Sequence, residues 1–298
     1  MSDVIGKYRT FLAVAEAGSI SEAARRLFVS QPAVSAELAA LEAALGVPLF
    51  ARSRRGVQLT EAGRVLIEYV RSAFSLLDAG EQKLRELLGL AGGTLRIGAS
   101  DMTLRFYLLD YIRAFRERYP AVRLTVTNAP TPRTLEALRD GTIDFGVVSG
   151  PLSLGTEELT LTPVRPVRDV FIVSPDHPLA AAHGVTRRDM AAYPTIMLEK
   201  NSTTRAYVSE WLGSEYPAPA IELATSDLLL EFAKRGIGIS SIVEDFAAEA
   251  LAKGEVVCLD LAEAPPPRHF YLAYSRRLPL SMAARTMLGL LEEAADEA

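Results

Sequence analysis

The sequence is poor in the residues that form disulfides and metal sites. Its 298 residues include one cysteine, Cys258, and three histidines without metal-ligand spacing. A single cysteine excludes a disulfide within the chain, which fits a reducing compartment. The neighbours of Cys258 in "EVVCLDL" alternate as in a buried strand, so we expect this cysteine to be a small core side chain.

Long apolar runs and catalytic motifs are also missing. No run is long enough to span a membrane, and the N-terminus has no apolar signal core. The sequence contains no nucleophile elbow, phosphate loop or dinucleotide fingerprint. His177 in "SPDHPLA" is typical of a turn before a helix rather than of a catalytic base. We therefore expect a cytoplasmic protein that is not an enzyme and has no cofactor.

Positive charge is scarce overall but unevenly distributed. The formal net charge is −5. Residues 1–60 carry seven Lys and Arg against five Asp and Glu, whereas the remaining residues carry 25 against 32. A mildly basic first segment on an acidic body indicates that only the first segment touches nucleic acid. So small an excess of positive charge predicts that one copy binds nucleic acid with modest affinity. Dimerisation should therefore matter for binding.

Two helices joined by a tight turn are predicted in "SISEAARRLFVSQPAVSAELAALEAALG", which begins at Ser19. The second helix has an apolar stripe at helical spacing, formed by Val34, Leu38, Leu41 and Leu45. Ser30 is its expected N-cap and Gly46 its stop. Ser21, or less favourably Ser19, is the expected cap of the first helix. This pattern predicts a helix-turn-helix, and an ordinary helical hairpin in a core is the alternative.

The next stretch, "PLFARSRRGVQLTEAG", favours the DNA-binding interpretation. It predicts a turn and a hairpin whose cations, Arg52, Arg54 and Arg55, lie beside Gly56. A long helix then begins at Thr60 or Glu61. A winged helix needs this order, with a reading helix followed by a hairpin whose cations meet phosphates.

The first sixty-odd residues resemble the N-terminal domain of LysR-type transcriptional regulators. The strings "SQPAVS", the later "LE", "LF.R" and "LT.AG" stand where the family has them. The outward face of the second helix is small and almost uncharged, as a helix that approaches base edges requires. The expected DNA-binding residues are Ser30, Gln31, Pro32, Ser35, Ala36, Arg52, Arg54 and Arg55. Gln31 can form a bidentate pair with adenine. For Arg52, a structural role is the alternative to a phosphate contact. The family often has basic or amide residues where this chain has Ala36 and Glu37.

A long linker helix is predicted from Glu61 to about Leu88, within a linker of residues 61–92. Its apolar positions approximate a heptad seam: Val65, Leu66, Tyr69, Val70, Ala73, Leu77, Leu84, Leu87 and Leu88. A second copy of the same helix is the natural partner for this stripe, and Gly80 interrupts it. The family resemblance implies tetramers, although the sequence does not distinguish a dimer from a tetramer.

Residues 93–298 alternate strands and helices, which predicts largely parallel sheets. We expect a first lobe of about 93–162 and 268–298 and a second lobe of about 163–267, with proline-rich crossings near 163–166 and 265–267. The strings "RIGAS", "L..G.IDFGVV", "HPLA" and "AKRGIGIS" resemble the LysR-type effector domain. The expected fold is therefore α/β, with a winged helix-turn-helix, a linker helix and a two-lobed domain like periplasmic binding proteins.

A ligand cleft is expected where strands end and helices begin. The expected effector-binding residues are Ser100, Met102, Thr103, Asn128, Thr131, Ser202 and Thr203. They come from three loops, 100–103, 128–131 and 199–205. A fourth loop, 225–227, is a further candidate, and N-capping is the alternative role for each hydroxyl. The third loop, 199–205, offers two nearby cations and suits a carboxylate or an oxyanion, whereas Asp101 favours a zwitterion.

The combined prediction is a transcription regulator that binds an inverted repeat as a homodimer and responds to a small polar effector. Three alternatives stay open: a transport binding protein, an architectural DNA-binding protein without an effector, and an enzyme. The first sixty residues count against a transport protein. The sequence names neither the effector nor the operator, and it does not separate activator from repressor.

Overall fold

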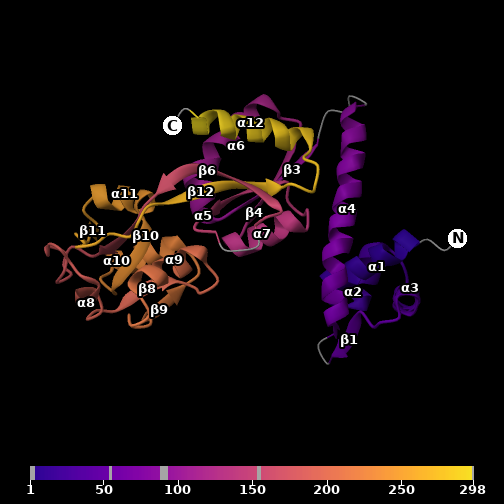
Figure 1. The fold of residues 1–298 in the computed structure, drawn as a ribbon, viewed down its shortest axis with the longest axis horizontal. Coiled ribbons are helices and arrows are strands. Elements are labelled where there is room, and N and C mark those ends of the chain that lie inside the picture. Colours follow the sequence, from indigo (N-terminus) through magenta and orange to yellow (C-terminus); the bar gives the residue numbers. More distant parts are fainter. Residues whose placement is uncertain (1–3, 54–55, 88–92, 153–155, 297–298) are drawn as a thin grey trace. The chain divides into compact units, whose positions relative to one another are not determined.

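The computed structural model describes residues 4–53, 56–87, 93–152 and 156–296, and it divides into two compact units. The first unit, which we call the head, contains three helices, a hairpin and most of a long fourth helix (Figure 1). The second unit, which we call the body, contains two five-stranded sheets and the remaining helices. Predicted positions 54, 55 and 88–92 lie outside the described residues.

The head begins with three helices, α1 (Val4–Ala17), α2 (Ile20–Leu27) and α3 (Gln31–Leu45). The expected caps of α3 are confirmed, since the Ser30 hydroxyl accepts from the Ala33 N–H at 3.3 Å and Gly46 ends the helix at φ 73°. The prediction that preferred Ser21 as the N-cap of α2 was wrong. Ser19 caps this helix by accepting from the Glu22 N–H at 3.4 Å, while the Ser21 hydroxyl donates to Gln31 Oε1 instead.

A short hairpin and a long helix complete the head: β1 (Phe50–Ser53), β2 (Gly56–Leu59) and α4 (Glu61–Leu87). The stripe of α3 is buried at Val34, Leu38 and Leu41, but Leu45 is 40% exposed, contrary to the prediction. Helix α4 adds Ile67 and Val70 to the same core.

Gly63 in "LTEAG" is required by close packing at the start of α4. A Cβ there would lie 2.2 Å from the Leu49 carbonyl oxygen, so only glycine fits without a shift.

The first lobe of the body is a mixed sheet in the order β4-β3-β5-β12-β6. Its strands are β3 (Thr94–Ala99), β4 (Arg123–Asn128), β5 (Phe145–Ser149), β6 (Leu159–Val167) and β12 (Arg268–Ser275). Helices α6 (Leu109–Arg118) and α12 (Met282–Asp296) cover one face, and α7 (Thr131–Arg139) covers the other (Figure 1). The short helices α5 (Asp101–Thr103) and η1 (Leu104–Leu108) precede α6.

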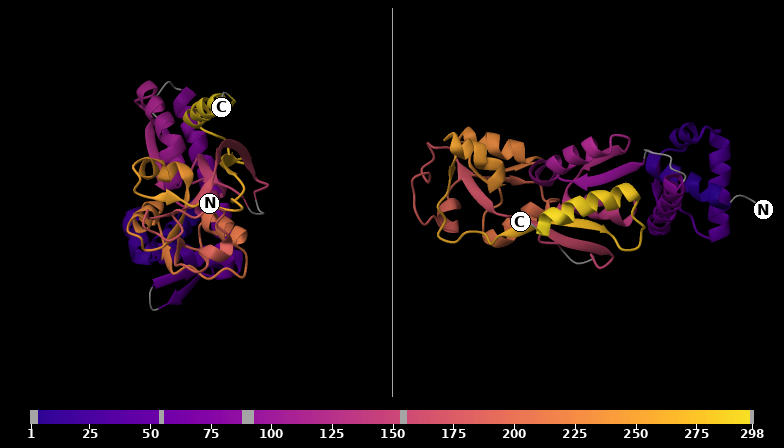
Figure 2. Two further views of the ribbon diagram at one scale, coloured as in Figure 1. Left: turned by 90° about the vertical axis from the view of Figure 1, so that its left-hand side faces the viewer. Right: turned by 90° about the horizontal axis from the view of Figure 1, so that it is seen from above.

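The second lobe is a mixed sheet in the order β11-β7-β10-β8-β9. Its strands are β7 (Asp169–Val173), β8 (Thr195–Leu198), β9 (Ile221–Leu223), β10 (Ile239–Val243) and β11 (Val257–Cys258). Its helices are α8 (Arg187–Met190), α9 (Thr203–Leu212), α10 (Ser226–Lys234) and α11 (Glu244–Ala252), which Figure 2 shows from two further sides.

Three details of the body differ from the sequence prediction. Pro163 and Pro166 lie inside β6, and the chain changes sheets at Arg168, a few residues later than expected. The sheets are only partly parallel, because β12 and β7 run antiparallel to their neighbours. Cys258 is exposed on the edge strand β11 rather than buried, since its neighbours Val256 and Leu259 take the core positions.

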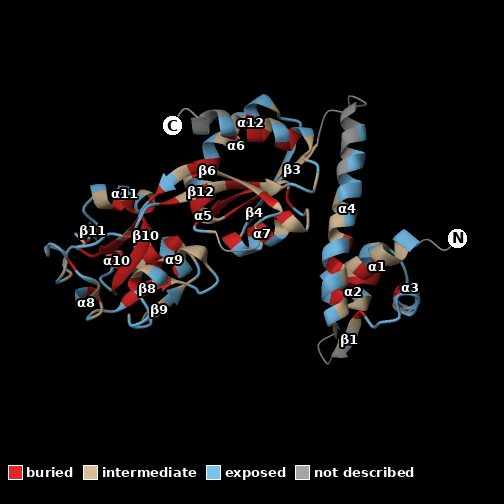
Figure 3. Cartoon of the chain, in the orientation of Figure 1, coloured by how far each residue is buried: buried red, intermediate tan, exposed pale blue. Residues whose placement is uncertain are grey.

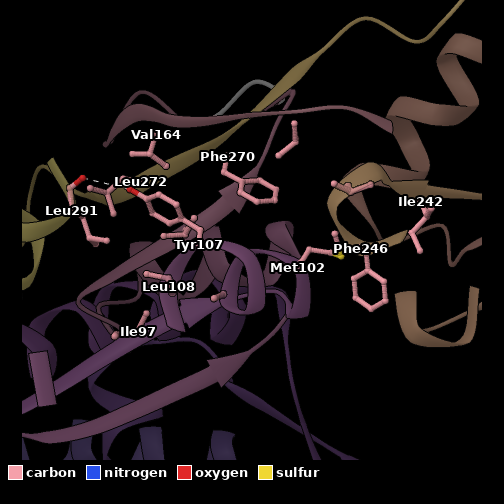
Figure 4. Packing of buried hydrophobic residues seen from close by; sticks show 14 of the residues in the cluster. Ile97, Met102, Tyr107, Leu108, Val164, Ile242, Phe246, Phe270, Leu272 and Leu291 are labelled. Carbon is pink, nitrogen blue, oxygen red and sulfur yellow. Dashed lines mark hydrogen bonds between the residues drawn. The ribbon is translucent and has the colours of Figure 1, made fainter. Parts of the chain in front are cut away.

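One apolar core runs through both lobes of the body. Met102 of α5 and Phe246 of α11 belong to the same cluster as Phe270 of β12, as the close view shows (Figure 4). The central strands of both sheets are buried, whereas exposed residues lie on the outer helices and loops (Figure 3). Among the described helices, none is both long and apolar enough to cross a membrane.

Candidate functional site

The outward face of α3 is small and almost uncharged, as predicted. Pro32 and Ala36 are exposed opposite the buried stripe, and Ser35 is half-buried beside them. Ser30 and Gln31 are exposed at the start of the helix. Gln31 Oε1 accepts from the Ser21 hydroxyl at 3.2 Å, which holds the amide at the start of the helix. An amide with both an acceptor and a donor can pair with an adenine edge in the major groove.

Two acidic residues on α3 have structural partners within the head. The Thr10 hydroxyl of α1 donates to Glu37 Oε2. Glu42 Oε1 accepts from the N–H groups of Leu49 and Phe50, at 2.7 and 3.1 Å. These bonds fix α3 against α1 and against the turn before β1. The role of Glu37 is therefore to hold helices together, which the sequence pattern alone did not reveal.

The predicted wing is a two-stranded hairpin. Arg52 of β1 pairs with Val57 of β2, and the Val57 N–H donates to the Gly18 carbonyl at 3.2 Å, which ties the hairpin to the turn after α1. Arg54 and Arg55 lie outside the described residues, and only the backbone of Arg52 is described. Phosphate contacts by these three arginines stay a prediction.

A polar cleft of about 300 Å³ lies between the two lobes of the body. It opens at the carboxyl ends of β3, β4, β5, β8 and β9, the edge at which α/β sheets bind ligands. Six of the seven predicted residues line it: Ser100, Met102, Asn128, Thr131, Ser202 and Thr203. Further lining side chains that the prediction did not select include Ser149, Asn201, Thr204 and Ser226.

Hydrogen bonds separate the hydroxyls that hold the fold from those that can meet a ligand. Thr103 does not line the cleft, because its buried hydroxyl accepts from the Ser100 N–H at 2.9 Å and donates to the Ser100 carbonyl at 3.1 Å. The Thr131 hydroxyl is occupied in the same way, since it accepts from the Ser149 N–H at 3.1 Å and donates to its carbonyl at 3.4 Å. Both side chains shape the cleft rather than offer a donor to it.

Two other hydroxyls keep their proton for the cleft. Ser202 caps α9 by accepting from the Arg205 N–H at 3.4 Å, and Thr204 Oγ1 accepts from Arg268 Nη2 at 3.1 Å. Because each oxygen acts as an acceptor in these bonds, its O–H is left to donate. Helices α7, α9 and α10 all begin at the cleft, and their N-termini add partial positive charge.

The charged residues around the cleft differ from the expected set. Asp101, which accepts from Asn128 Nδ2, and Glu199 line the cleft, and no Lys or Arg is among the lining residues that the structure describes. Arg205, one of the two expected cations, is 8% exposed and donates to the Leu198 carbonyl and Glu222, at 2.9 and 3.0 Å. Its charge is already paired, so the partial positive charge that faces the cleft comes from helix N-termini rather than from this cation.

Arg268 lies behind the cleft, at the point where the chain returns to the first lobe. It donates to both oxygens of Asp169, to the Gly150 carbonyl at 3.1 Å and to Thr204 Oγ1. Asp169 starts β7, just after the other crossing. The side chains are 3% and 0% exposed, so a buried ion pair joins the two crossings.

Two further ion pairs join the lobes. Arg105 of η1 lies 3.2 Å from Asp227 of α10, and Arg165 of β6 lies 2.9 Å from Asp245 of α11. In all three pairs the arginine comes from the first lobe and the aspartate from the second. The arrangement of the lobes in this structure is therefore held by charge as well as by the shared core.

Two of the histidines have polar partners, and His183 Nδ1 lies 2.9 Å from Asp260 Oδ2. Burial lowers the pKa of His177, whose Nδ1 accepts from the Leu179 N–H at 3.1 Å. The expected turn is present, but the next helix, α8, begins only at Arg187. Within the described ranges, no group of three or more His, Cys, Asp and Glu side chains is placed to hold a metal ion.

Comparison with known proteins agrees with this architecture. Residues 89–296 match the family model described as LysR substrate binding domain. Residues 5–64 match the model described as bacterial regulatory helix-turn-helix protein, lysR family.

Two curated relatives cover most of the chain. The HTH-type transcriptional activator CmpR of Synechocystis is 29% identical over 96% of this chain and 93% of the relative. A probable RuBisCO transcriptional regulator of Trichormus variabilis is 31% identical over 95% of this chain and 87% of the relative.

Two solved structures share the fold. Full-length OxyR of Pseudomonas aeruginosa has a TM-score of 0.68 at 20% identity, and covers 98% of this chain and 97% of its own. The regulatory domain of Synechocystis CcmR, solved in complex with 2-PG, has a TM-score of 0.61 at 24% identity, and covers 68% of this chain and 97% of its own. Since both family models match in their expected order and relatives align along nearly the whole length, this chain belongs to the LysR family of transcriptional regulators.

Proposed function

We propose that this regulator acts in the cytoplasm as a homodimer on inverted-repeat promoter DNA, and that a small anionic or zwitterionic effector in the cleft changes its DNA-bound arrangement. The observation that carries the effector half is the cleft itself, where hydroxyl donors remain after the fold's own hydrogen bonds are made. The effector acts by preferring one arrangement of lobes and heads over another.

In the DNA-binding half, the exposed face of α3 enters the major groove. Gln31 pairs with a base edge, while Pro32, Ser35 and Ala36 come close to thymine methyl groups. The backbone of Ser30 contacts the DNA at the start of the helix, and Arg52, Arg54 and Arg55 of the wing contact phosphates. The small uncharged surface of α3 supports this placement, since it lets the helix approach the bases.

The exposed apolar face of α4 supports a dimer. Several of its large apolar side chains are about half exposed or more: Val65, Tyr69, Leu76, Leu77 and Leu84. Together α4 and α1 form an apolar groove of about 280 Å³, lined by Ile5, Tyr8, Leu66, Tyr69, Val70, Ala73, Phe74 and Leu77. A second copy of α4 is the occupant we propose, because the stripe continues along the helix beyond the head core. A dimer would also double the weak positive charge of one head.

An anionic group of the effector fits the starts of α9 and α10. The N-terminus of α9 offers backbone N–H groups together with the Ser202, Thr203 and Thr204 hydroxyls. Asp101 and Glu199 at the same cleft can accept from a hydroxyl or ammonium group elsewhere on the effector. The relative CcmR, solved with 2-PG, is consistent with a small ligand at the regulatory domain.

A ligand screen on the full chain tests the effector proposal. We expect a panel of carboxylates, phosphate esters and amino acids to contain compounds that raise the melting temperature. Thr203→Val should weaken the best of them by about 1–3 kcal/mol and leave DNA binding unchanged, because a buried ligand oxygen loses its donor. Thr125→Val, exposed on β4 away from the cleft, is the matched control. A panel without any stabilising compound would favour an architectural DNA-binding protein.

DNA selection tests the other half. Incubating the full chain with a random duplex library should enrich inverted repeats that are bound by dimers in sedimentation measurements. Enrichment of single half-sites, with a monomer on each duplex, would contradict the dimer.

A further inference from the structure

The turn between α2 and α3 contains a conformational outlier, Phe28. It adopts φ 57° and ψ 38° directly after α2. The Phe28 N–H donates to the Arg25 carbonyl at 3.3 Å and the Val29 N–H donates to the Ala24 carbonyl at 3.1 Å, so this left-handed residue closes the helix. Glycine is the usual residue at such a position, because a Cβ crowds the neighbouring carbonyl in the left-handed conformation.

Glycine does take this role elsewhere in the same chain. In the described ranges, every other residue with positive φ is a glycine, including Gly18 after α1 and Gly46 after α3. Of the first three helices of the head, α1 and α3 are followed by glycine and only α2 ends in a bulky residue. A bulky side chain at positive φ is a genuine outlier that destabilises the local backbone.

The side chain gives no packing in return. Phe28 is 96% exposed, and the next residue, Val29, is 49% exposed. Aromatic rings normally stabilise a protein by being buried. This ring therefore combines backbone strain with loss of burial in the free protein, a combination that points to a functional contact.

The position of Phe28 indicates what covers it. It lies three residues before Gln31, at the end of α3 that we place in the major groove. The last turn of α2 beside it presents Arg25 and Arg26, with side chains 77% and 53% exposed. Both arginines share the single carboxylate of Glu22, so a net positive charge remains next to the ring. Apolar surface flanked by cations matches the edge of a DNA groove, where sugar carbons and methyl groups lie between phosphates.

We propose that Phe28 is a DNA contact, whose ring packs against apolar carbon of the duplex beside the base pairs that α3 reads. The carbon surface belongs to a deoxyribose or to a thymine methyl group. This inference rests on the proposed placement of α3 in the major groove. It explains why the chain retains a strained, exposed phenylalanine where its other helices use glycine.

The test uses the full chain and a duplex that the wild-type protein selects from a random library. Phe28→Gly and Phe28→Asn remove the ring and suit the left-handed backbone, so affinity should fall roughly tenfold while the melting temperature stays equal or rises. Phe28→Tyr keeps the ring face and should bind within about twofold of the wild type. Val47→Asn, a 42% exposed apolar residue after the other end of α3, is the matched control and should bind as the wild type does.

Replacing thymine by uracil in the selected duplex separates the two carbon sources. A thymine whose replacement weakens wild-type binding but has no further effect on Phe28→Gly assigns the contact to that thymine's methyl group. If no single thymine behaves in this way, the contact is assigned to deoxyribose. Unchanged affinity of both Phe28→Gly and Phe28→Asn would overturn the proposal and leave the ring to a protein partner. A lower melting temperature of both variants would overturn it too, because the ring would then support the fold. If the wild type selects no duplex, or Gln31→Ala leaves base preference unchanged, the proposed function fails instead.

Discussion

Replacing Arg268 by methionine tests how the two lobes of the body are joined. Arg268→Met keeps the length of the side chain but replaces its guanidinium by an apolar group. The Asp169 carboxylate, 0% exposed, then loses its cation, and the Gly150 carbonyl and the Thr204 hydroxyl lose a donor. Breaking a buried pair by removing one partner typically costs about 3–5 kcal/mol. We expect a loss of that order in the free energy of unfolding.

The chain supplies its own control and its own reporter. Arg277→Met makes the same substitution in a pair with Glu158 whose side chains are 71% and 41% exposed, so it should cost about 1 kcal/mol or less. Trp211 is the only tryptophan, and its ring lies 5.2 Å from Phe171 in the second lobe. Its fluorescence during urea unfolding of the full chain therefore follows the body.

Two results would refute this reasoning. One is a loss from Arg268→Met that is no larger than the loss from Arg277→Met. The other is a double variant, Arg268→Met with Asp169→Asn, that is no more stable than Arg268→Met alone. Neutralising the orphaned carboxylate should recover part of the loss, because the cost comes from an uncompensated buried charge.

Four further predictions follow from individual residues. Gln31→Ala should broaden base preference and cost about 1–3 kcal/mol on the selected duplex; an unchanged base-substitution profile would contradict this. Arg52→Ala should weaken specific and non-specific DNA alike and lower the salt slope by about one, whereas a loss of helical circular dichroism would indicate a structural role. Gly63→Ala should destabilise the head by about 1–3 kcal/mol, since its Cβ would meet the Leu49 carbonyl; an unshifted thermal transition would argue against it. Burial raises the pKa of Tyr216 from 10.0 to about 12, so the unfolded chain ionises first and stability falls as pH rises between these values. Tyr216→Phe should lose less stability than the wild type over that range in urea titrations, and equal losses would show that Tyr216 does not contribute.

The sequence by itself determined the features that depend on neighbouring residues. The caps Ser30 and Gly46 and the buried stripe of α3 are local signals, because a helix is closed by its own end residues and its period is fixed. The alternation of strands and helices likewise placed the cleft loops, since parallel strands end at one edge of a sheet. Six predicted cleft residues therefore came together without knowledge of a single long-range contact.

Only the tertiary structure decided which of those side chains are available to a ligand. Whether the Thr131 hydroxyl is occupied depends on Ser149, eighteen positions away in the sequence. Whether Arg205 is a free cation depends on Glu222 of the edge strand β9, seventeen positions away. Arg268 carries no local signal, because its partners come from distant segments of both lobes. A hydroxyl or a guanidinium has a fixed number of donors and acceptors, and its role is settled by which partners the fold brings within hydrogen-bond distance.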